Sequence, residues 1–262
     1  MVLGLITAFS GYTAVYALND VIDYRVDREK IQASTLSESK KDLDNVYVRH
    51  PLAQGMLSYG KGLFWVVAWA ALAMVGAYLL NPVCAFIFLL ACLLEALYCR
   101  LLKITHLRGI ISGAVKTSGP VAAVLAVDPN PDILFLLVLF LWLFFWEIGG
   151  QNIPNDWGDM EEDRKIQAKT IPVHFGFRGS LLIIFISLFI ALAMSLFMYW
   201  ISPRGLGLIY LFGAFFSGFY FFLLPGYRLY QAQTSEEAFH LFNRASYYPL
   251  AMLMVTMISW AI

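Results

Sequence analysis

Two short segments hold half of the acidic residues of this chain. Residues 19–29 contain four of the 18 acidic residues, and residues 153–163 contain five. In both segments an Asn-Asp pair is followed by Asp after three residues, by Asp after four more, and then by Arg. Two matching acidic patterns favour a shared chemical role over two solvated helix ends. The matching residues are Asn19, Asp20, Asp23, Asp27 and Arg28, and Asn155, Asp156, Asp159, Asp163 and Arg164.

The spacing of these residues predicts metal binding. Side chains three and four residues apart lie on one face of a helix. Asn19, Asp23 and Asp27 are therefore predicted to form an oxygen-rich stripe, and the equivalent residues of the second motif a second stripe. Mg²⁺ prefers oxygen ligands and keeps positions open for substrate phosphates. The predicted catalytic metal ligands are Asp23, Asp27, Asp159 and Asp163, with Asn19, Asp20, Asn155 and Asp156 as further ligands.

The elements that carry the motifs are too apolar for a soluble protein. Hydrophobic residues make up 60% of the chain, charged residues 14%, and the mean hydropathy is +0.69. Continuous apolar runs of about 20 residues predict spanning helices rather than the alternating strands of a membrane barrel. We therefore expect an all-α, polytopic membrane helical bundle. Eight spans are predicted, near residues 1–20, 60–80, 82–101, 109–127, 132–152, 179–200, 205–226 and 245–262.

The basic residues lie almost entirely on one side of this predicted bundle. Sixteen of the 18 Lys and Arg lie in or beside the longer connections, whereas Arg204 lies in a short connection and Lys116 inside a span. Positive charge marks the cytoplasmic face. We expect a multi-pass protein of the cell inner membrane whose active site faces the cytoplasm. Cytoplasmic cap loops are predicted near residues 21–59, 100–108 and 150–178.

The domain organisation follows from the same pattern. The two motifs recur 136 residues apart, each at the end of an apolar helix. Many membrane folds are built from internal repeats. Residues 1–262 are therefore predicted to form a single transmembrane domain with two pseudo-repeated halves.

The net charge, the cysteines and the histidines argue against several kinds of binding site. Basic and acidic residues number 18 each, so the net charge is zero and no nucleic-acid partner is expected. The cysteines lack the paired spacing of a zinc or redox site, and we interpret them as core or lipid-facing thiols. They are Cys84, Cys92 and Cys99. The histidines lie singly in or near loops, and no pair has metal-ligand spacing. They are His50, His106, His174 and His240.

On these motifs, the sequence resembles the UbiA superfamily of intramembrane prenyltransferases over nearly its whole length. Residues 19–28 (NDVIDYRVDR) and 155–176 (NDWGDMEEDRKIQAKTIPVHFG) are similar to the two Asp motifs of the family. Residues 49–58 (RHPLAQGMLS) resemble its Arg-Pro-Leu-x-x-Gly segment with His50 inserted, and residues 98–103 its tyrosine-lysine element. The family usually has nine helices, so we expect its first helix to be absent from this chain.

The resemblance implies Mg²⁺-dependent ionisation of an allylic prenyl diphosphate, followed by attack of an electron-rich, lipid-soluble acceptor in the membrane lipid. The leaving diphosphate is a polyanion, so cationic side chains must neutralise its charge as it develops. Arg28 and Lys103 match family positions for this role. Further candidates at the same face are Lys30, Arg49, Arg164 and Lys169, and Lys116 is a candidate inside a span.

Buried charges and rings near the motifs are additional candidates. A charge inside a span marks function by default, and Lys116 is expected to pair with Glu95 or Glu147 or to bind diphosphate. Aromatic faces stabilise cations, although ordinary packing is the preferred interpretation of any single ring. The rings that precede the motifs on one helix side are Tyr12, Tyr16, Trp142 and Phe145.

The predicted function is prenyl transfer to an aromatic or other lipid-soluble acceptor, in isoprenoid-quinone biosynthesis. The Asp-Arg-Lys and Lys-Thr-Ile-Pro elements of the second motif resemble quinone-type and chlorin-type members. Chlorin, haem or glycerol-lipid acceptors are alternatives, as is an ion-coupled transporter, because carboxylates inside a membrane mark ion paths. The polar segment 28–49 is predicted to form either a cap, with a short helix begun by the capping box of Thr35 and Glu38, or a flexible linker.

Overall fold

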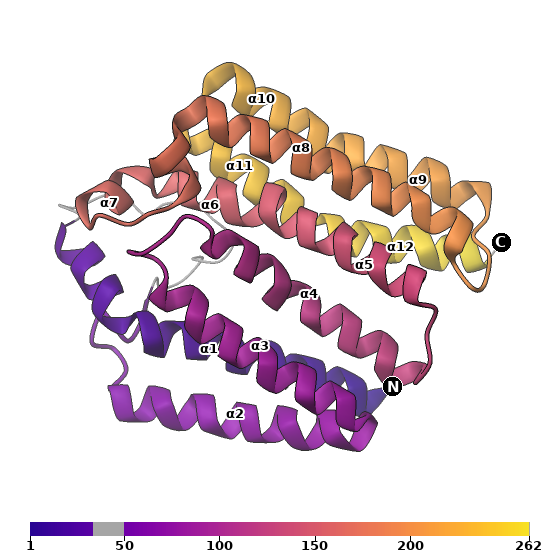
Figure 1. Ribbon diagram of the computed structural model, residues 1–262, viewed down its shortest axis with the longest axis horizontal. Helices are drawn as coiled ribbons and strands as arrows, with labels where there is room; N and C mark the ends of the chain where they lie inside the picture. Colours follow the sequence, from indigo (N-terminus) through magenta and orange to yellow (C-terminus); the bar gives the residue numbers. More distant parts are fainter. Residues whose placement is uncertain (34–49, 262) are drawn as a thin grey trace. The chain divides into compact units, whose positions relative to one another are not determined.

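A computed structural model describes residues 1–33 and 50–261, and within these residues every regular element is a helix. The predicted all-α class is confirmed. The chain divides into two compact units. The described residues of the first unit are 1–33, 50–131 and 161–170, and those of the second are 132–160 and 171–261. Figure 1 shows the course of the chain through these helices.

Seven helical stretches of the described chain are long and apolar enough to cross a membrane. They are Val2–Ile31, Tyr59–Leu80, Pro82–Arg100, Arg108–Val127, Ile133–Gly158, Ile171–Ile201 and Leu208–Ala232. The predicted eighth span, 245–262, has a different structure. Helix α11 (Ser235–Ser246) ends there, and α12 (Tyr248–Ala261) begins with Pro249 in its first turn, where the missing N–H of proline is tolerated. The 14 residues of α12 run to Ala261, the last residue that the structure describes.

In the first unit, α1 (Val2–Ala33) packs along α2 (Tyr59–Leu80) and α3 (Pro82–Arg100), and α4 (Arg108–Val127) packs on α3. Residues 12–33 contain neither Gly nor Pro, so nothing interrupts α1. Its 32 residues measure about 48 Å at 1.5 Å per residue, against about 30 Å of hydrocarbon. The segment predicted as a loop from residue 21 is therefore helical as far as Ala33, and the first Asp motif extends α1 beyond its apolar part.

A short segment far along the sequence also belongs to the first unit. Helix α7 (Met160–Lys165) is followed by a turn and a short irregular segment, in which the Lys169 N–H donates to the Leu102 carbonyl at 2.7 Å. Ile166 and Ala168 are buried against Leu102. These contacts fix the end of the second Asp motif within the first unit.

The second unit contains the remaining helices. They are α5 (Ile133–Trp146), the π-helix η2 (Glu147–Asn152), α6 (Ile153–Gly158), α8 (Ile171–Ile201), α9 (Leu208–Gly218), the π-helix η3 (Phe219–Leu223), α10 (Leu224–Ala232), α11 and α12. Trp157, Tyr210 and Tyr248 are fully buried in its core. Helix α8 is kinked at Gly176, where φ is 65°, a conformation that glycine adopts without a Cβ penalty.

Candidate functional site

The first Asp motif lies on one uninterrupted face of α1, as its spacing predicts. A helix turns about 100° per residue, so Asn19, Asp23, Asp27 and Asp20 follow one another around about 100° of its circumference. Asp27 is only 6% exposed, whereas Asp20 is partly exposed. The motif therefore presents its oxygen atoms in one direction, with the most buried carboxylate, Asp27, toward the Asp20 side of the face.

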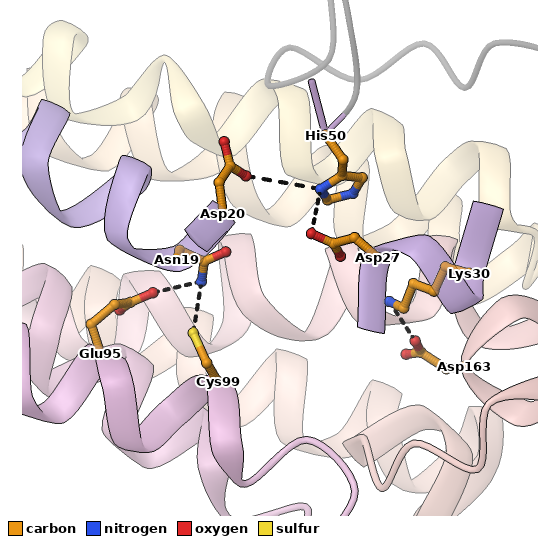
Figure 2. A network of polar contacts seen from close by, with 8 residues as sticks. All are labelled: Asn19, Asp20, Asp27, Lys30, His50, Glu95, Cys99 and Asp163. Carbon is orange, nitrogen blue, oxygen red and sulfur yellow. Dashed lines mark hydrogen bonds and ion pairs between the residues drawn. The ribbon is translucent and has the colours of Figure 1, made fainter. Parts of the chain in front are cut away.

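An unpredicted histidine lies against two of these carboxylates. His50 Nδ1 is 2.9 Å from Asp27 Oδ2 and 3.9 Å from Asp20 Oδ1, as Figure 2 shows. One ligating atom from each of the three residues lies within 4.8 Å of the others. The spacing of the histidines alone did not reveal this group, because its other members are carboxylates. The available signal was the insertion of His50 before Pro51.

A buried carboxylate of α3 orients the first residue of the motif. Asn19 Nδ2 donates to Glu95 Oε1 at 2.7 Å and to Cys99 Sγ at 3.3 Å. In Figure 2 the amide oxygen of Asn19 points away from both partners. Glu95 and Cys99 are 6% and 3% exposed. Cys99 is thus a buried thiol, as predicted, but it also contacts the motif, and Glu95 was predicted only as a partner for Lys116.

Asp23 opens on a cavity of about 780 Å³ in the first unit. The cavity lies beside α1 and the end of α3, and Lys103 also lines it. Its polar and aromatic lining residues are Asp23, Tyr24, Arg25, Tyr59, Cys99, Arg100 and Lys103. The cavity therefore combines one motif carboxylate with basic side chains and two aromatic rings, which suits an anionic group attached to an apolar one.

The last carboxylate of the second motif lies beside the helix of the first. Lys30 Nζ is 2.8 Å from Asp163 Oδ1, and the Asp163 side chain is 1% exposed. Figure 2 shows this ion pair reaching from α1 to Asp163. Lys30 follows Asp27 by three residues on α1. A buried carboxylate is stable when it is paired in this way, so the pair holds Asp163 close to the first motif.

The rest of the second motif differs from its predicted structure. Helix α6 ends at Gly158, Asp159 has φ −98° and ψ 6°, and α7 begins at Met160. Asn155, Asp159 and Asp163 therefore do not form a stripe on one continuous helix. Asp156 and Asp159 are each 5% exposed in the second unit. The spacing rule failed here because it assumes an uninterrupted helix.

A glycine beside the helix end allows a close contact with α11. A Cβ on Gly158 would lie 2.2 Å from Phe239 Cζ, far inside van der Waals contact. Trp157, the residue directly before Gly158, is fully buried and stacks on Phe177 with ring centroids 5.0 Å apart. Tight packing of both residues in the second unit fixes the backbone immediately before Asp159.

The predicted diphosphate ligands have different surroundings. Arg28 is exposed, with Nη1 3.5 Å from the Tyr24 hydroxyl. Lys103 Nζ is 2.5 Å from Glu29 Oε2, and both side chains are largely exposed. Such exposed contacts contribute little to stability, so an anionic ligand can compete with the present partners of Arg28 and Lys103. Arg164 is exposed on α7, and Arg49 and the predicted cap helix at Thr35 to Glu38 lie outside the described residues.

Lys116 has a partner that was not predicted. Its Nζ donates to the Tyr16 hydroxyl at 2.7 Å and lies 3.9 Å from the centroid of that ring. Tyr16 precedes Asp20 by one turn of α1, so this pair lies close to the motif. By contrast, Trp142 packs edge-on against Tyr248 in the core of the second unit. This contact agrees with the prediction that a single ring of this kind serves in ordinary packing.

Comparisons with known proteins agree with this organisation. The model of the UbiA prenyltransferase family matches residues 1–247. A UbiA homolog from Aeropyrum pernix K1 has a similar structure, with a TM-score of 0.73 and 21% identity over 98% of this chain and 89% of that chain. A digeranylgeranylglyceryl phosphate synthase has a TM-score of 0.69 and 18% identity over 98% of this chain and 84% of that chain.

A third similar structure was solved with a ligand. It is a UbiA homolog from Archaeoglobus fulgidus bound to DMAPP and Mg²⁺, with a TM-score of 0.65 and 16% identity over 98% of this chain and 87% of that chain. At these identities the structural likeness shows a shared fold. No curated protein matches the chain.

Proposed function

The chain belongs to the UbiA prenyltransferase family, whose model matches residues 1–247, and from that premise we propose how this prenyltransferase works. It is an integral membrane protein with seven spans among its described helices. It moves a prenyl group from a Mg²⁺-bound prenyl diphosphate to a lipid-soluble acceptor. Related folds support the donor, since homologs from Archaeoglobus fulgidus were solved with DMAPP or GPP and Mg²⁺.

The chemistry of the side chains fits Mg²⁺. Both motifs supply carboxylate and amide oxygens, which are the ligands that this ion prefers. When bound, Mg²⁺ neutralises the charge that develops on the leaving diphosphate. The proposed ligands are Asp23, Asp27, Asp159 and Asp163, with Asn19, Asp20, Asn155 and Asp156 in support.

One observation carries the proposal that the two motifs act together. The ion pair of Lys30 with Asp163 holds a carboxylate of the second motif beside the helix of the first. If the two motifs served only to stabilise the fold, Lys30 could pair with any acidic residue. Its partner is instead the last Asp of the second motif. We therefore assign both motifs to one diphosphate.

The cationic residues bind and stabilise the departing diphosphate. Arg28 and Lys103 are exposed enough to rearrange toward an anion, and Lys103 lines the cavity that Asp23 also lines. Tyr24 and Tyr59 give this cavity aromatic walls, which shield an allylic cation from water and stabilise its charge. Arg49, Arg164 and Lys116 are further candidate ligands for the diphosphate.

The acceptor that we propose is an aromatic precursor of an isoprenoid quinone. Support comes from the Asp-Arg-Lys and Lys-Thr-Ile-Pro elements at residues 163–165 and 169–172. The one-sided distribution of basic residues, 16 of 18, supports an active site at the cytoplasmic face of the cell inner membrane. The whole chain is proposed to act as a single catalytic domain.

The experiment that tests this function uses the full chain in lipid nanodiscs. The protein is incubated with Mg²⁺, labelled prenyl diphosphates of several lengths and a panel of acceptors, and products are identified by mass. We expect a prenylated aromatic acceptor. A product made only with a chlorin, haem or glycerol-lipid acceptor would replace the proposed acceptor. Ion-coupled transport by proteoliposomes without any prenylated product would overturn the enzymatic assignment.

A further inference from the structure

We propose that His50 is a nitrogen ligand of the ion bound at the first motif, together with Asp20 and Asp27. The site would then have mixed nitrogen and oxygen ligands and would bind first-row transition ions such as Mn²⁺ more tightly than Mg²⁺. This inference rests on the proposed function, because it concerns an ion at the same motif. It adds a residue outside both Asp motifs and a metal preference.

The distances suit coordination of a small ion. In an octahedral site with bonds of about 2.1 Å, adjacent ligand atoms are about 3.0 Å apart and opposite ones about 4.2 Å. His50 Nδ1 and Asp27 Oδ2 are 2.9 Å apart, which matches an adjacent pair. His50 Nδ1 and Asp20 Oδ1 are 3.9 Å apart, which lies between the two values. Only small side-chain adjustments are needed to place one ion among the three atoms.

The two carboxylates are aligned by α1. Asp20 and Asp27 are seven residues apart on one helix, which corresponds to almost two full turns. Their side chains therefore lie on the same side of α1 but about 10 Å apart along its axis at the backbone. His50 comes from a different segment and bridges this separation, since its Nδ1 approaches both carboxylates.

The segment that carries His50 is anchored to α1. Leu52 is 4% exposed and packs with Val21 and Val66. The Gln54 N–H donates to the His50 carbonyl at 3.1 Å, which closes a turn directly after the histidine. His50 itself has φ 53°, a conformation that is uncommon for a residue with a side chain. The imidazole is therefore held over the motif by packing and by the backbone.

The chemistry of imidazole gives the expected metal preference. Mg²⁺ favours carboxylates, carbonyls and water, whereas imidazole suits first-row transition ions such as Fe²⁺, Ni²⁺ and Zn²⁺; Mn²⁺, the weakest binder of that series, also takes oxygen ligands. For ligation, Nδ1 presents its lone pair and the ring proton resides on Nε2. If His50 were instead only a hydrogen-bond donor to the two carboxylates, Nδ1 would carry the proton and no metal–nitrogen bond would form. The two roles are distinguished by the presence or absence of that bond.

The test measures the metal–nitrogen bond directly. The full chain in nanodiscs is loaded with Mn²⁺ in the presence of geranyl diphosphate, and electron spin echo modulation is recorded. We expect a ¹⁴N coupling typical of a directly bound imidazole. His50→Ala should remove this coupling and weaken Mn²⁺ binding by at least about ten-fold, the lower end of losses seen when groups that support a metal site are removed. Mg²⁺ binding should weaken less.

Two variants keep the test decisive. His50→Gln retains a hydrogen-bond donor but no imidazole nitrogen, so it should lose the coupling while its melting temperature shows that the protein still folds. His240→Ala, which changes a histidine of α11 near Glu237, is the matched control and should retain the coupling. Bound Mn²⁺ without ¹⁴N coupling, or coupling that survives in His50→Ala, would overturn the role of His50 while prenyl transfer continued. Absence of both metal binding and prenylated product would overturn the proposed function as well.

Discussion

The first and second Asp motifs share one residue pattern but lie on different backbones. The first motif is part of a 32-residue helix without interruption. The second follows a π-helix and is divided at Asp159 between two helices of six residues each. At the position where the first motif has Ile22, the second has Gly158 in close contact with Phe239. A spacing pattern can therefore be kept for its chemistry while its backbone is fixed by local packing.

The largest expected effect tests whether the two motifs are equally necessary despite this difference. Asp23→Ala and Asp159→Ala should each lower turnover by at least about 100-fold, because each removes a group that stabilises developing charge. Turnover is followed as prenylated product by mass. Asp128→Asn is the matched control, since Asp128 is the C-cap residue of α4 and belongs to neither motif. Full activity in either Ala variant would remove that motif from the site.

The second prediction concerns packing before the central Asp. Gly158→Ala forces a methyl group against Phe239 and should destabilise the protein by about 1–3 kcal/mol, as overpacking does. Ile22→Ala, at the matching position of the first motif, should cost less because Ile22 is only half-buried. Thermal unfolding of the two variants in the same detergent measures the difference. Equal melting temperatures would mean that the contact at Gly158 is not a constraint.

The third prediction concerns the amide of the first motif. Glu95→Leu removes the acceptor that orients Asn19, and one hydrogen bond contributes about 0.5–1.5 kcal/mol. We expect the half-saturating Mg²⁺ concentration to rise about ten-fold, with Glu95→Gln close to the wild type. Because both changes act through one amide, Asn19→Ala combined with Glu95→Leu should be no worse than Asn19→Ala alone. Additive effects would place Glu95 in a separate role.

The sequence predicted the parts of this molecule that depend on local patterns. Hydropathy located seven spans, and spacing identified both motifs. It did not predict the break at Tyr247, which separates α11 from α12 near the start of the last apolar run. It also missed the contacts of His50 with Asp27 and of Glu95 with Asn19. Those partners are separated by 23 and 76 residues in the chain, and only the packing of separate segments brings them together.

The smallest effect is expected at the exposed pair of Lys103 and Glu29. Glu29→Gln should change stability by less than about 1 kcal/mol, because exposed ion pairs contribute little. Lys103→Ala should raise the KM for prenyl diphosphate while Glu29→Gln leaves it unchanged or lower. Steady-state kinetics at saturating acceptor separates the two residues. An equal rise of KM in both variants would indicate that the ion pair itself, and not the free cation, is required.

The central claim is that carboxylates of both motifs hold metal ions on one prenyl diphosphate. The most direct measurement is prenyl transfer by the purified chain before chelation, after removal of divalent ions with EDTA, and after Mg²⁺ is restored. Product formation should stop in EDTA and return with Mg²⁺ in the wild type, but should not return in Asp23→Ala or Asp159→Ala. Prenyl transfer that persists in EDTA would contradict the account.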